Sequence, residues 1–467
     1  MAKHHASAAP VAPEVVLPLA KAAERMAAGK SLRNKVPRLA HAAWNTPANR
    51  ADPINILRAA DATRVSSLVP LRYGRMLQSP FTFYRGSAGV MASDLAHTPA
   101  TGVHVQICGD AHLLNFGGFA TPERRLLFDV NDLDETLPGP WEWDVKRLVA
   151  SFVLAARANR LSDGAGRDAA IACAHSYRRH MREFARLDVL ETWYSRIDDT
   201  DLLAMLPHTQ QAVLKKRIAK ATVHNSSELV FPKLVEQAGR EQRIHDDPPV
   251  IFHPDETIAD ASIDEARAAL TSYRDTLSDD RRALLDRYEL VDLAVKVVGI
   301  GSVGTLCMIA LLISVAGTPL FLQIKEANAS VLERYAGKSA YKHAGERVVR
   351  GQRLMQPASD LFLGWVTGGK GRQFYVRQLR DVKLAPLVET WDAGMLTIYA
   401  RACGWVLARA HAKAGGPWAI SGYLGKQDEF DEAMGRFALA YADQAEKDYD
   451  VLKGAVRAGT IEVQMDR

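Results

Sequence analysis

Residues 103–151 read VHVQICGDAHLLNFGGFATPERRLLFDVNDLDETLPGPWEWDVKRLVAS, and no other part of the chain carries so many potentially catalytic side chains in so few residues. Two apolar runs, 103–107 and 126–130, predict strands, and each is followed by a short polar loop. A turn with two prolines comes next, and an amphipathic pattern from about Asp144 onward predicts a helix. The stretch therefore predicts two strand ends and a helix start around two polar loops.

Three residues on these loops suit the chemistry of phosphoryl transfer. Asp110 and Asn115 lie five residues apart on the first loop, and Asp132 follows the second strand. That reaction needs a carboxylate to accept a hydroxyl proton, and an amide and a carboxylate to hold magnesium against phosphates. Each residue alone has a plainer explanation, because Asp and Asn are common turn formers that bond nearby backbone. Their ordered occurrence favours a metal and substrate site.

The same segments resemble known kinases. GDAHLLN at 109–115 resembles the GDxHxxN catalytic loop of aminoglycoside phosphotransferases, choline kinases and other protein-kinase-like small-molecule kinases. NDLDE at 131–135 and WEWDVKRL at 141–148 resemble the metal-binding IDFDD and the later WDLA of that superfamily. The twelve-residue step from Asp132 to Asp144 is also typical of it.

Over a longer span, from about Arg33 to the C-terminus, the chain resembles an uncharacterised bacterial family, domain of unknown function 2252. The segments that carry this resemblance are RYGRM, FYRG, GDAHLLNFG, NDLDET and the late ARAHA. One departure from the kinase pattern is Cys108, which occupies the place of a histidine that mainly orients the catalytic loop. Because the family name implies no activity, the kinase-like residues carry the functional hypothesis.

A second informative region, 293–379, predicts strands around a glycine-rich turn, GIGSVG at 299–304. A GxGxxG pattern also occurs in dinucleotide folds, where a helix follows it immediately. Here the next apolar run reads as a strand, which resembles a kinase glycine loop. The region therefore resembles the small lobe of a kinase.

The third strand predicted in this region carries Lys325, which resembles the lysine of the kinase VAIK motif. Twenty-one residues later Glu346 lies in a helical segment, where the glutamate that pairs with this lysine would be. Glu326 and Glu333 are rivals for that role, and residues 378–379 fall where the adenine-binding hinge would be. The plainer alternatives are a solvent-facing lysine at a sheet edge and a glutamate on an exposed helix.

The resemblance implies an α+β, protein-kinase-like fold with two lobes, rich in helices and with a small antiparallel five-stranded lobe. Because the catalytic segment precedes the small lobe, the order implies a circular permutation, which nearby termini make tolerable. The implied parts are a basic N-terminal arm with packing helices, a large-lobe segment with the catalytic and metal loops, the small lobe, and C-terminal helices. Their bounds are 1–78, 79–290, 291–381 and 382–467.

The implied activity is ATP- and magnesium-dependent phosphorylation of a hydroxyl on a small molecule. Asp110 would orient the hydroxyl and take its proton, while Asn115 and Asp132 would hold magnesium with help from Asp134. The residues implied to bind ATP are Gly299, Gly301, Ser302, Gly304, Lys325, Glu346, Gln378 and Leu379. Those implied to support the catalytic loop are His112 and Asp144.

Composition is that of a soluble globular protein, with 48% hydrophobic and 24% charged residues in 467. Four widely spaced cysteines without a CxxC pair predict a reducing, cytoplasmic location. The uncharged run 297–324 is longer than the ~20 residues of a membrane-spanning helix, but its glycines and its Gly-Thr-Pro turn predict two buried strands. No membrane span and no secretory signal are therefore predicted.

Residues 1–60 contain nine Lys and Arg against three Asp and Glu, which makes this segment a basic arm. Such an arm is usually a solvated segment, and a nucleic-acid or anionic-lipid partner is the lower-ranked alternative. Two nearer alternatives to a kinase are a nucleotide-binding pseudokinase and an enzyme that transfers AMP. No pattern predicts an oligomeric state.

Other local patterns give predictions of their own. Residues 79–86, SPFTFYRG, alternate aromatics in the manner of a strand, and they include Arg85 as a candidate phosphate ligand. Residues 245–255 predict a surface loop, with a histidine-based metal site as the less favoured alternative. Long helices are predicted at 145–156, 165–184, 389–412 and 428–458.

Overall fold

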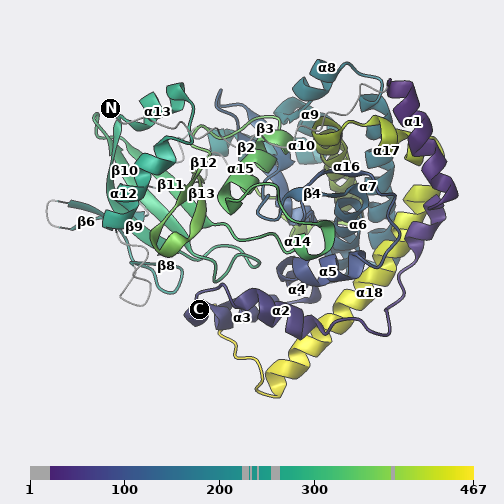
Figure 1. Ribbon diagram of the computed structural model, residues 1–467, viewed down its shortest axis with the longest axis horizontal. Coiled ribbons are helices and arrows are strands. Elements are labelled where there is room, and N and C mark those ends of the chain that lie inside the picture. Colours follow the sequence, from purple (N-terminus) through teal and green to yellow (C-terminus); the bar gives the residue numbers. More distant parts are fainter. Residues whose placement is uncertain are drawn as a thin grey trace, which may run out of the picture.

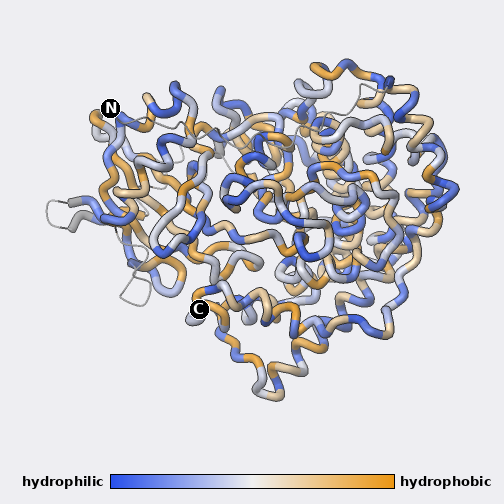
Figure 2. Tube along the Cα trace, in the orientation of Figure 1, coloured by the Kyte–Doolittle hydropathy of each residue, from blue (hydrophilic) through white to orange (hydrophobic). Residues whose placement is uncertain are grey.

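The computed structural model describes residues 21–222, 231, 234–238, 241–253, 263–379 and 384–466. One large sheet lies at one end of the molecule and long helices lie at the other (Figure 1). The short strands β2, β3 and β4 lie between these two halves (Figure 1). In Figure 2 hydrophobic segments run through the sheet and the central helices, and hydrophilic segments predominate at the periphery.

The sheet half is a six-stranded antiparallel sheet in the order β12-β13-β11-β10-β9-β8. Its strands are β8 (Ile251–Phe252), β9 (Tyr288–Lys296), β10 (Cys307–Ser314), β11 (Pro319–Glu326), β12 (Gly364–Thr367) and β13 (Gln373–Gln378). The predicted five-stranded lobe is therefore wrong in its number of strands. The extra strand, β8, pairs with β9 from within the segment predicted to be a surface loop. Two residues are too few for an alternating pattern to reveal.

The uncharged run 297–324 contributes the glycine-rich turn and most of the β10–β11 hairpin. Gly317, with a φ of 78°, lies in the turn of this hairpin, and Leu312 pairs with Leu320 across it. The strand, turn, strand prediction is thus confirmed. In the part of the chain that the structure describes, no helix has the length and apolarity needed to cross a membrane.

One face of the sheet is covered by α12 (Ile263–Arg274) and α13 (Asp279–Leu285). The strands contribute alternate apolar side chains to this interface, as expected when one face of a sheet is buried. Its buried residues include Tyr273, Leu285, Leu293, Leu312, Leu322 and Phe374. This packing fixes the direction of the side chains on β11, including that of Lys325.

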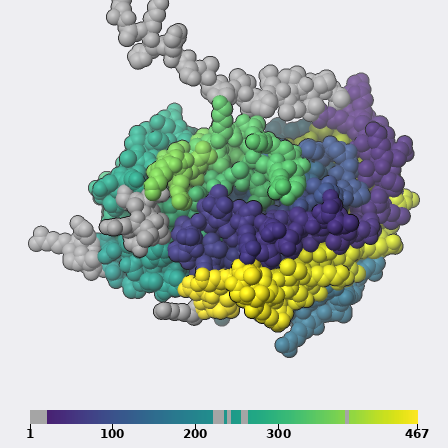
Figure 3. All heavy atoms as spheres, turned by 60° about the horizontal axis from the view of Figure 1, so that its bottom comes forward, coloured from purple at the N-terminus to yellow at the C-terminus, as the bar shows by residue number. Residues whose placement is uncertain are grey.

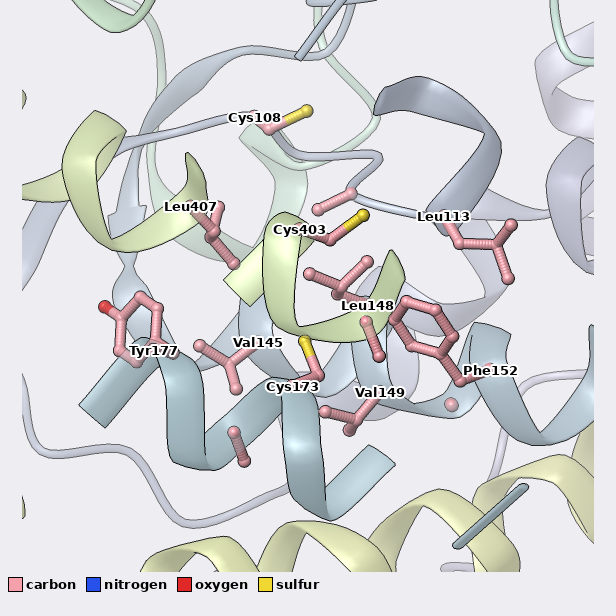
Figure 4. Close-up of a cluster of buried hydrophobic side chains, with 14 of the residues drawn as sticks. Cys108, Leu113, Val145, Leu148, Val149, Phe152, Cys173, Tyr177, Cys403 and Leu407 are labelled. Carbon is pink, nitrogen blue, oxygen red and sulfur yellow. The ribbon is translucent and has the colours of Figure 1, made fainter. Parts of the chain in front are cut away.

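Four long helices build the other half: α6 (Trp141–Ala158), α7 (Asp163–Phe184), α16 (Ala393–Gly415) and α18 (Glu429–Arg457). All four helices predicted there are confirmed. The third begins later than predicted, because the side chain of Asp392 accepts a hydrogen bond from Met395 N at 2.8 Å and caps the helix at that point. Figure 4 shows Leu148, Cys173 and Cys403 in the apolar core of this half.

Residues 79–86 do not form the predicted strand, because α4 (Pro80–Gly86) is a helix. Ser79 caps it by accepting from Thr82 N at 3.1 Å, while Ser79 N donates to Thr82 Oγ1 at 2.8 Å. Pro80 in the first turn already has a helical φ. These capping signals outweigh the aromatic alternation, whose side chains are buried on more than one side of a short helix.

Shorter strands present the two polar loops between the halves. The predicted strands at 103–107 and 126–130 are confirmed, as β1 (His104–Ile107) and β3 (Leu126–Val130). β1 pairs with β4 (Leu137–Pro140), and β3 pairs with β2 (Phe116–Ala120) and β5 (Ile197–Asp198). A separate hairpin joins β6 (Val235–Ala238) and β7 (Glu241–Ile244).

The N-terminal segment packs along the molecule beside the C-terminal helix, as the adjacent purple and yellow atoms show (Figure 3). Its helices are α1 (Ala22–Ser31), α2 (Pro53–Asp61), α3 (Val69–Met76) and α5 (Ala88–Leu95). Arg33 donates to the carbonyl groups of Gly422 and Tyr423, and Arg50 forms ion pairs with Asp94 and Asp448. These basic residues stabilise the fold, whereas the first twenty residues of the predicted basic arm lie outside the described residues.

Shorter helices complete the described structure: α8 (Val189–Tyr194), α9 (Asp199–Met205), α10 (His208–Thr222), α14 (Glu333–Ala336), α15 (Ala344–Met355) and α17 (Trp418–Leu424). Of these, α15 matters most for the site, because it packs against β13 and β12 beside the two polar loops. It lies near the centre of the molecule, between the two halves (Figure 1).

Candidate functional site

Asp144, in the first turn of α6, holds the backbone of the first polar loop. Its carboxylate accepts hydrogen bonds from Cys108 N at 2.6 Å and from Gly109 N at 2.9 Å. This carboxylate is buried, and His411 Nε2 lies 3.2 Å from it. Gly109 has a φ of 84°, and a Cβ there would lie 2.6 Å from a backbone carbonyl oxygen, so only glycine fits. These contacts fix the position of Asp110, the next residue.

Asp110 forms an ion pair with Arg147, one turn along α6 from Asp144, at 2.5 Å. Burial raises the pKa of Asp110, and the positive charge of Arg147 opposes that rise. Asn115 donates from Nδ2 to the backbone carbonyl of Asp110 at 2.6 Å. His112 Nε2 lies 3.9 Å from the Asp110 carboxylate. The loop thus brings together the three site residues predicted on it.

The second polar loop meets the sheet at Lys325. The ammonium lies 2.6 Å from the Asp134 carboxylate and 3.5 Å from that of Asp132, and it is almost wholly buried. Tyr375 donates to the other oxygen of Asp134 at 2.5 Å. Burial disfavours the charged form of Lys325, but the two carboxylates outweigh this and hold its pKa well above the ordinary value. Burial and the charge of Asp132 raise the pKa of Asp134.

The structure does not bring Glu346 to Lys325. Glu346 lies on α15 and its recorded ion pair is with Arg350, one turn along the same helix, at 3.4 Å. Its neighbour Arg347 turns inward instead and donates to the backbone carbonyl of Asp134 at 2.8 Å. The helix therefore presents an arginine to the second polar loop, and Asp134 takes the position beside the lysine that the sequence assigned to Glu346.

The two rival glutamates have other partners as well. Glu326 accepts from Leu306 N at 2.8 Å and lies 3.3 Å from Arg372. It follows Lys325 directly in β11, so the two side chains point to opposite faces of the sheet. Glu333 accepts from Ser330 N at 3.2 Å. The partner of Lys325 comes from the second polar loop, far away in sequence.

The glycine-rich turn between β9 and β10 is held in place by the N-terminal segment. Arg75 donates to the carbonyl of Gly299 at 2.7 Å, and Val65 N donates to the carbonyl of Gly304 at 2.7 Å. Arg64 donates to the carbonyl of Val303 at 2.5 Å. These contacts join segments more than two hundred residues apart, and no local pattern in the sequence indicates them.

Gln378 and Leu379 lie at the end of β13, on a cavity wall, but their backbone N–H groups are engaged. Gln378 N donates to Asp360 at 2.8 Å, and Leu379 N donates to the carbonyl of Phe321 at 2.9 Å. A kinase hinge binds adenine through backbone groups. A ligand at this wall would therefore meet the side chains and carbonyl groups of this segment rather than these two N–H groups.

Two cavities meet at the predicted site. The sheet-side cavity, of about 760 Å³, is lined among others by Lys325, Gln378 and Leu379. The loop-side cavity, of about 650 Å³, is lined by residues of both polar loops and of the N-terminal segment, including Asp110, His112, Asn115, Asp134 and Arg85. Three predicted site residues line both cavities: Asp132, Gly299 and Ser302. Gly301 lines the loop-side cavity, whereas Gly304 and Glu346 line neither.

Sequence reasoning missed the arginines that hold these loops. Arg147 could have been found, because it lies three residues after Asp144 and so on the same face of the helix. Arg64 and Arg75 lie in the N-terminal segment, and their contacts with the glycine-rich turn depend on tertiary structure alone. The second polar loop likewise receives Tyr375 from β13, which no spacing rule predicts.

The histidines near residue 250 form a separate polar group. His253 lies 2.8 Å from Asp246 and 3.1 Å from Asp292, and hydrogen bonds that its ring donates to these carboxylates raise its pKa, Asp292 contributing most. His245 lies 3.0 Å from Glu236. Among the residues that the structure describes, no three His, Cys, Asp or Glu side chains are grouped as a metal site would require. Residues 254–255 of this predicted loop lie outside the described residues.

The chain was compared with protein-family models, curated proteins and solved structures. A family model described as "Uncharacterized protein conserved in bacteria (DUF2252)" matches residues 64–455. No curated protein and no solved structure matches the chain. The matched residues include both polar loops, the glycine-rich turn and Lys325.

Proposed function

The chain belongs to this bacterial family, whose description assigns no activity, and from the site itself we propose that the protein is an ATP- and magnesium-dependent phosphotransferase acting on a hydroxyl of a small molecule. The proposal includes a protein-kinase-like fold of two lobes in circularly permuted order. It rests on the residues around the two cavities rather than on any relative of known activity.

The observation that carries the proposal is the meeting of the two cavities at Asp132 and at the backbone of Gly299 and Ser302. Phosphoryl transfer needs a donor and an acceptor on either side of one charged centre. The sheet-side cavity, with Lys325 in its wall, would take the nucleotide. The loop-side cavity, with Asp110 in its wall, would take the acceptor.

The oxygen groups at this centre fit magnesium. Mg²⁺ is usually bound in such sites by one or two carboxylates together with substrate phosphates and water. Asp132 is suited to this role, because its carboxylate is 37% exposed and lies at the junction of the cavities. Asn115 would contribute its amide oxygen, and Asp134 would chiefly hold Lys325. When bound, magnesium would neutralise charge on the phosphates.

The chain's own residues would then do three things. Lys325 would neutralise phosphate oxygens on the nucleotide, with Asp134 holding the ammonium in place. Asp110 would orient the acceptor hydroxyl and take its proton as the hydroxyl oxygen bonds to the γ-phosphorus and the bond from that phosphorus to the departing ADP breaks. Arg147 and the backbone contacts of Asp144 keep the Asp110 carboxylate in one position, which is the pre-organisation that such catalysis needs.

A second candidate function is supported by the position of Asp134. In a kinase a glutamate pairs with the lysine, but here Lys325 pairs with Asp134, 2.6 Å away. A lysine held by a residue of the metal loop is compatible with an altered nucleotide pose, and so with transfer of AMP or with a nucleotide-binding pseudokinase. The mass of the product separates the cases: phosphate adds about 80 Da and AMP about 329 Da, as their formulae require.

Thermal unfolding with ATP, with magnesium and with both tests the proposal, using wild type and Asp132→Ala. Ligand at about a hundred times its dissociation constant adds ~2.7 kcal/mol, which moves the midpoint by several degrees. We expect a shift with ATP plus magnesium that weakens in Asp132→Ala. Once an acceptor is identified, its turnover by Asp132→Ala should be roughly 10²–10³-fold slower than by wild type. Asp450→Ala, at an exposed carboxylate on α18, is the matched control. No shift in wild type at millimolar nucleotide would refute a nucleotide site here.

A further inference from the structure

The wall of the loop-side cavity carries basic side chains as well as the acidic ones described above. Four arginines line it: Arg64, Arg72, Arg85 and Arg334. Two of them have internal partners, since Arg64 and Arg72 both form ion pairs with Asp61. Arg334 is exposed and lies over the ring of Tyr335. The fourth, Arg85, lies at the end of α4.

Arg85 differs from the others because its half-buried side chain forms no ion pair in the part of the chain that the structure describes. Its Nε is fully buried, and within the described part of the chain that atom has no hydrogen-bond acceptor and the guanidinium forms no ion pair. The carboxylate of Asp110 acts on it electrostatically. That carboxylate is already bound by Arg147 at 2.5 Å. Burial lowers the pKa of the Arg85 guanidinium, and Asp110 opposes that change.

The other carboxylates of the cavity wall are also engaged. Asp134 and Asp132 lie 2.6 Å and 3.5 Å from Lys325, and Glu135 accepts from Val331 N at 2.8 Å and from the hydroxyl of Ser330 at 2.9 Å. Glu326 accepts from a backbone N–H and lies close to an arginine. A half-buried cation without an anion has lost part of its hydration, and an anionic ligand would give it a partner.

The position of Arg85 relates it to the reacting hydroxyl. It is close enough to Asp110 and His112 for its charge to act on both. Its backbone carbonyl also lies beside the glycine-rich turn, 3.4 Å from where a Cβ on Gly301 would be. A group bound by Arg85 would therefore lie on the acceptor side, next to the hydroxyl that Asp110 orients. A planar guanidinium suits a carboxylate or a phosphate.

We propose that the acceptor carries an anionic group, a carboxylate or a phosphate, beside its hydroxyl, and that Arg85 binds this group in the loop-side cavity. The identification of the bound molecule as the acceptor rests on the proposed function. The binding of the anion itself does not, because it needs neither nucleotide nor magnesium.

Calorimetric titration with three small probes tests it: glycerate, glycerol 3-phosphate and neutral glycerol. Wild type should bind one or both anions and not glycerol. Arg85→Gln should bind them about 10- to 100-fold more weakly, the range expected for a lost charge-assisted contact. Arg85→Lys should retain part of the affinity. Glycerate and glycerol 3-phosphate distinguish a carboxylate site from a phosphate site.

Arg267→Gln, which removes the same charge from an exposed position on α12, is the matched control and should bind like wild type. The thermal shift with ATP plus magnesium is measured on the same variants and should be unchanged in Arg85→Gln. Equal anion binding by wild type and Arg85→Gln, or none by wild type, would overturn the inference even if nucleotide binds. A nucleotide shift lost in Arg85→Gln would overturn it too, by placing Arg85 on the donor. Arg85-dependent anion binding without any nucleotide shift would uphold the anion site and refute the phosphotransferase.

Discussion

Asp144 links the helical half of the molecule to the loop that carries Asp110. Its two hydrogen bonds are charge-assisted, short and buried, and such bonds are about twice as strong as neutral ones. They hold a turn at Gly109 that another residue could not adopt without strain. A single carboxylate thus sets both the shape of the loop and the direction of its catalytic candidate.

Replacing this carboxylate gives the first prediction beyond the site tests. Asp144→Ala leaves two buried N–H groups unsatisfied, so we expect the free energy of unfolding in urea to fall by about 3–5 kcal/mol. Asp450→Ala, at an exposed position, should change it by less than about 0.5 kcal/mol. A loss below about 1 kcal/mol in Asp144→Ala would mean that water takes over both hydrogen bonds.

The sequence suggested Lys325 as a candidate site residue with Glu346 as its partner, whereas the structure pairs Lys325 with Asp134. The order of motifs along a chain predicts which side chains form a pair only when the fold brings the corresponding elements together. Here Glu346 points along α15 toward Arg350, and the neighbouring Arg347 faces the second polar loop. Which of two adjacent helical side chains faces a site depends on how the helix is rotated against the sheet, and packing decides that rotation.

The glycine-rich turn contains three glycines in six residues, yet its position is fixed by contacts from another part of the chain. It begins at Gly299, with a φ of 68°, and its carbonyl groups are bound by the N-terminal segment. Because its carbonyl groups are bound from outside, the turn is held in one shape, and within it Val303 N donates to the carbonyl of Ile300 at 3.4 Å. In the proposed nucleotide site, other N–H groups of the turn would face the phosphate oxygens.

Two glycines of this turn form a matched pair for mutation. Gly299→Ala forces a side chain into the left-handed region and should cost roughly 1–2 kcal/mol, together with a smaller thermal shift from ATP plus magnesium. Gly301→Ala, with a Cβ in ordinary contact at 3.4 Å, should leave both quantities close to those of wild type. If the two variants behaved alike, the shape of the turn would not govern nucleotide binding.

The elements that were mispredicted share a cause. The segment at 79–86 has aromatic alternation, but its caps determine a helix, and β8 is a two-residue strand with no pattern of its own. Periodicity needs several repeats to be informative, so it fails for very short elements. The long helices and the β9, β10 and β11 strands provide those repeats and were predicted well.

At the scale of the whole molecule, residues near the two ends of the chain pack together beside the site. In the N-terminal segment α2 and α4 pack against α18, and the C-terminal tail returns to α3, where Arg75 pairs with Asp466 at 2.9 Å. The same arginine donates to Gly299. The N-terminal segment therefore connects the C-terminus to the glycine-rich turn, and it also supplies part of the loop-side cavity.

His41 makes this packing sensitive to acid. Burial, with a contribution from Lys146, lowers the pKa of His41 to about 3 from its ordinary value of 6.5. Between these values the unfolded state binds a proton that the folded state does not, so stability is fully present above pH 6.5 and is lost as the pH falls. Between pH 7 and pH 5 wild type should lose about 2 kcal/mol more than His41→Gln.

Urea unfolding at pH 7, 6 and 5 measures this difference, with His97→Gln, at an exposed histidine, as the control. The control should lose as much stability as wild type does. Parallel curves for wild type and His41→Gln would contradict the prediction, since they would show that the folded state accepts the proton at His41.

Local patterns in the chain predicted the long helices and five of the six strands of the large sheet, and they supplied the candidate residues of the proposed site. Those features depend on local repeats and on short motifs such as GDAHLLN and NDLDE, which any reader of the chain can count. The twelve-residue step from Asp132 to Asp144 is another such local feature.

Which of these groups meet depends on contacts between segments that are far apart in the chain. The pairing of Lys325 with Asp134, the arginines that bind the glycine-rich turn and the position of Arg85 in the wall of the loop-side cavity all join segments far apart in the chain. A buried charge pairs with an opposite charge that the packing brings close to it. That packing depends on the whole core rather than on neighbours in the sequence.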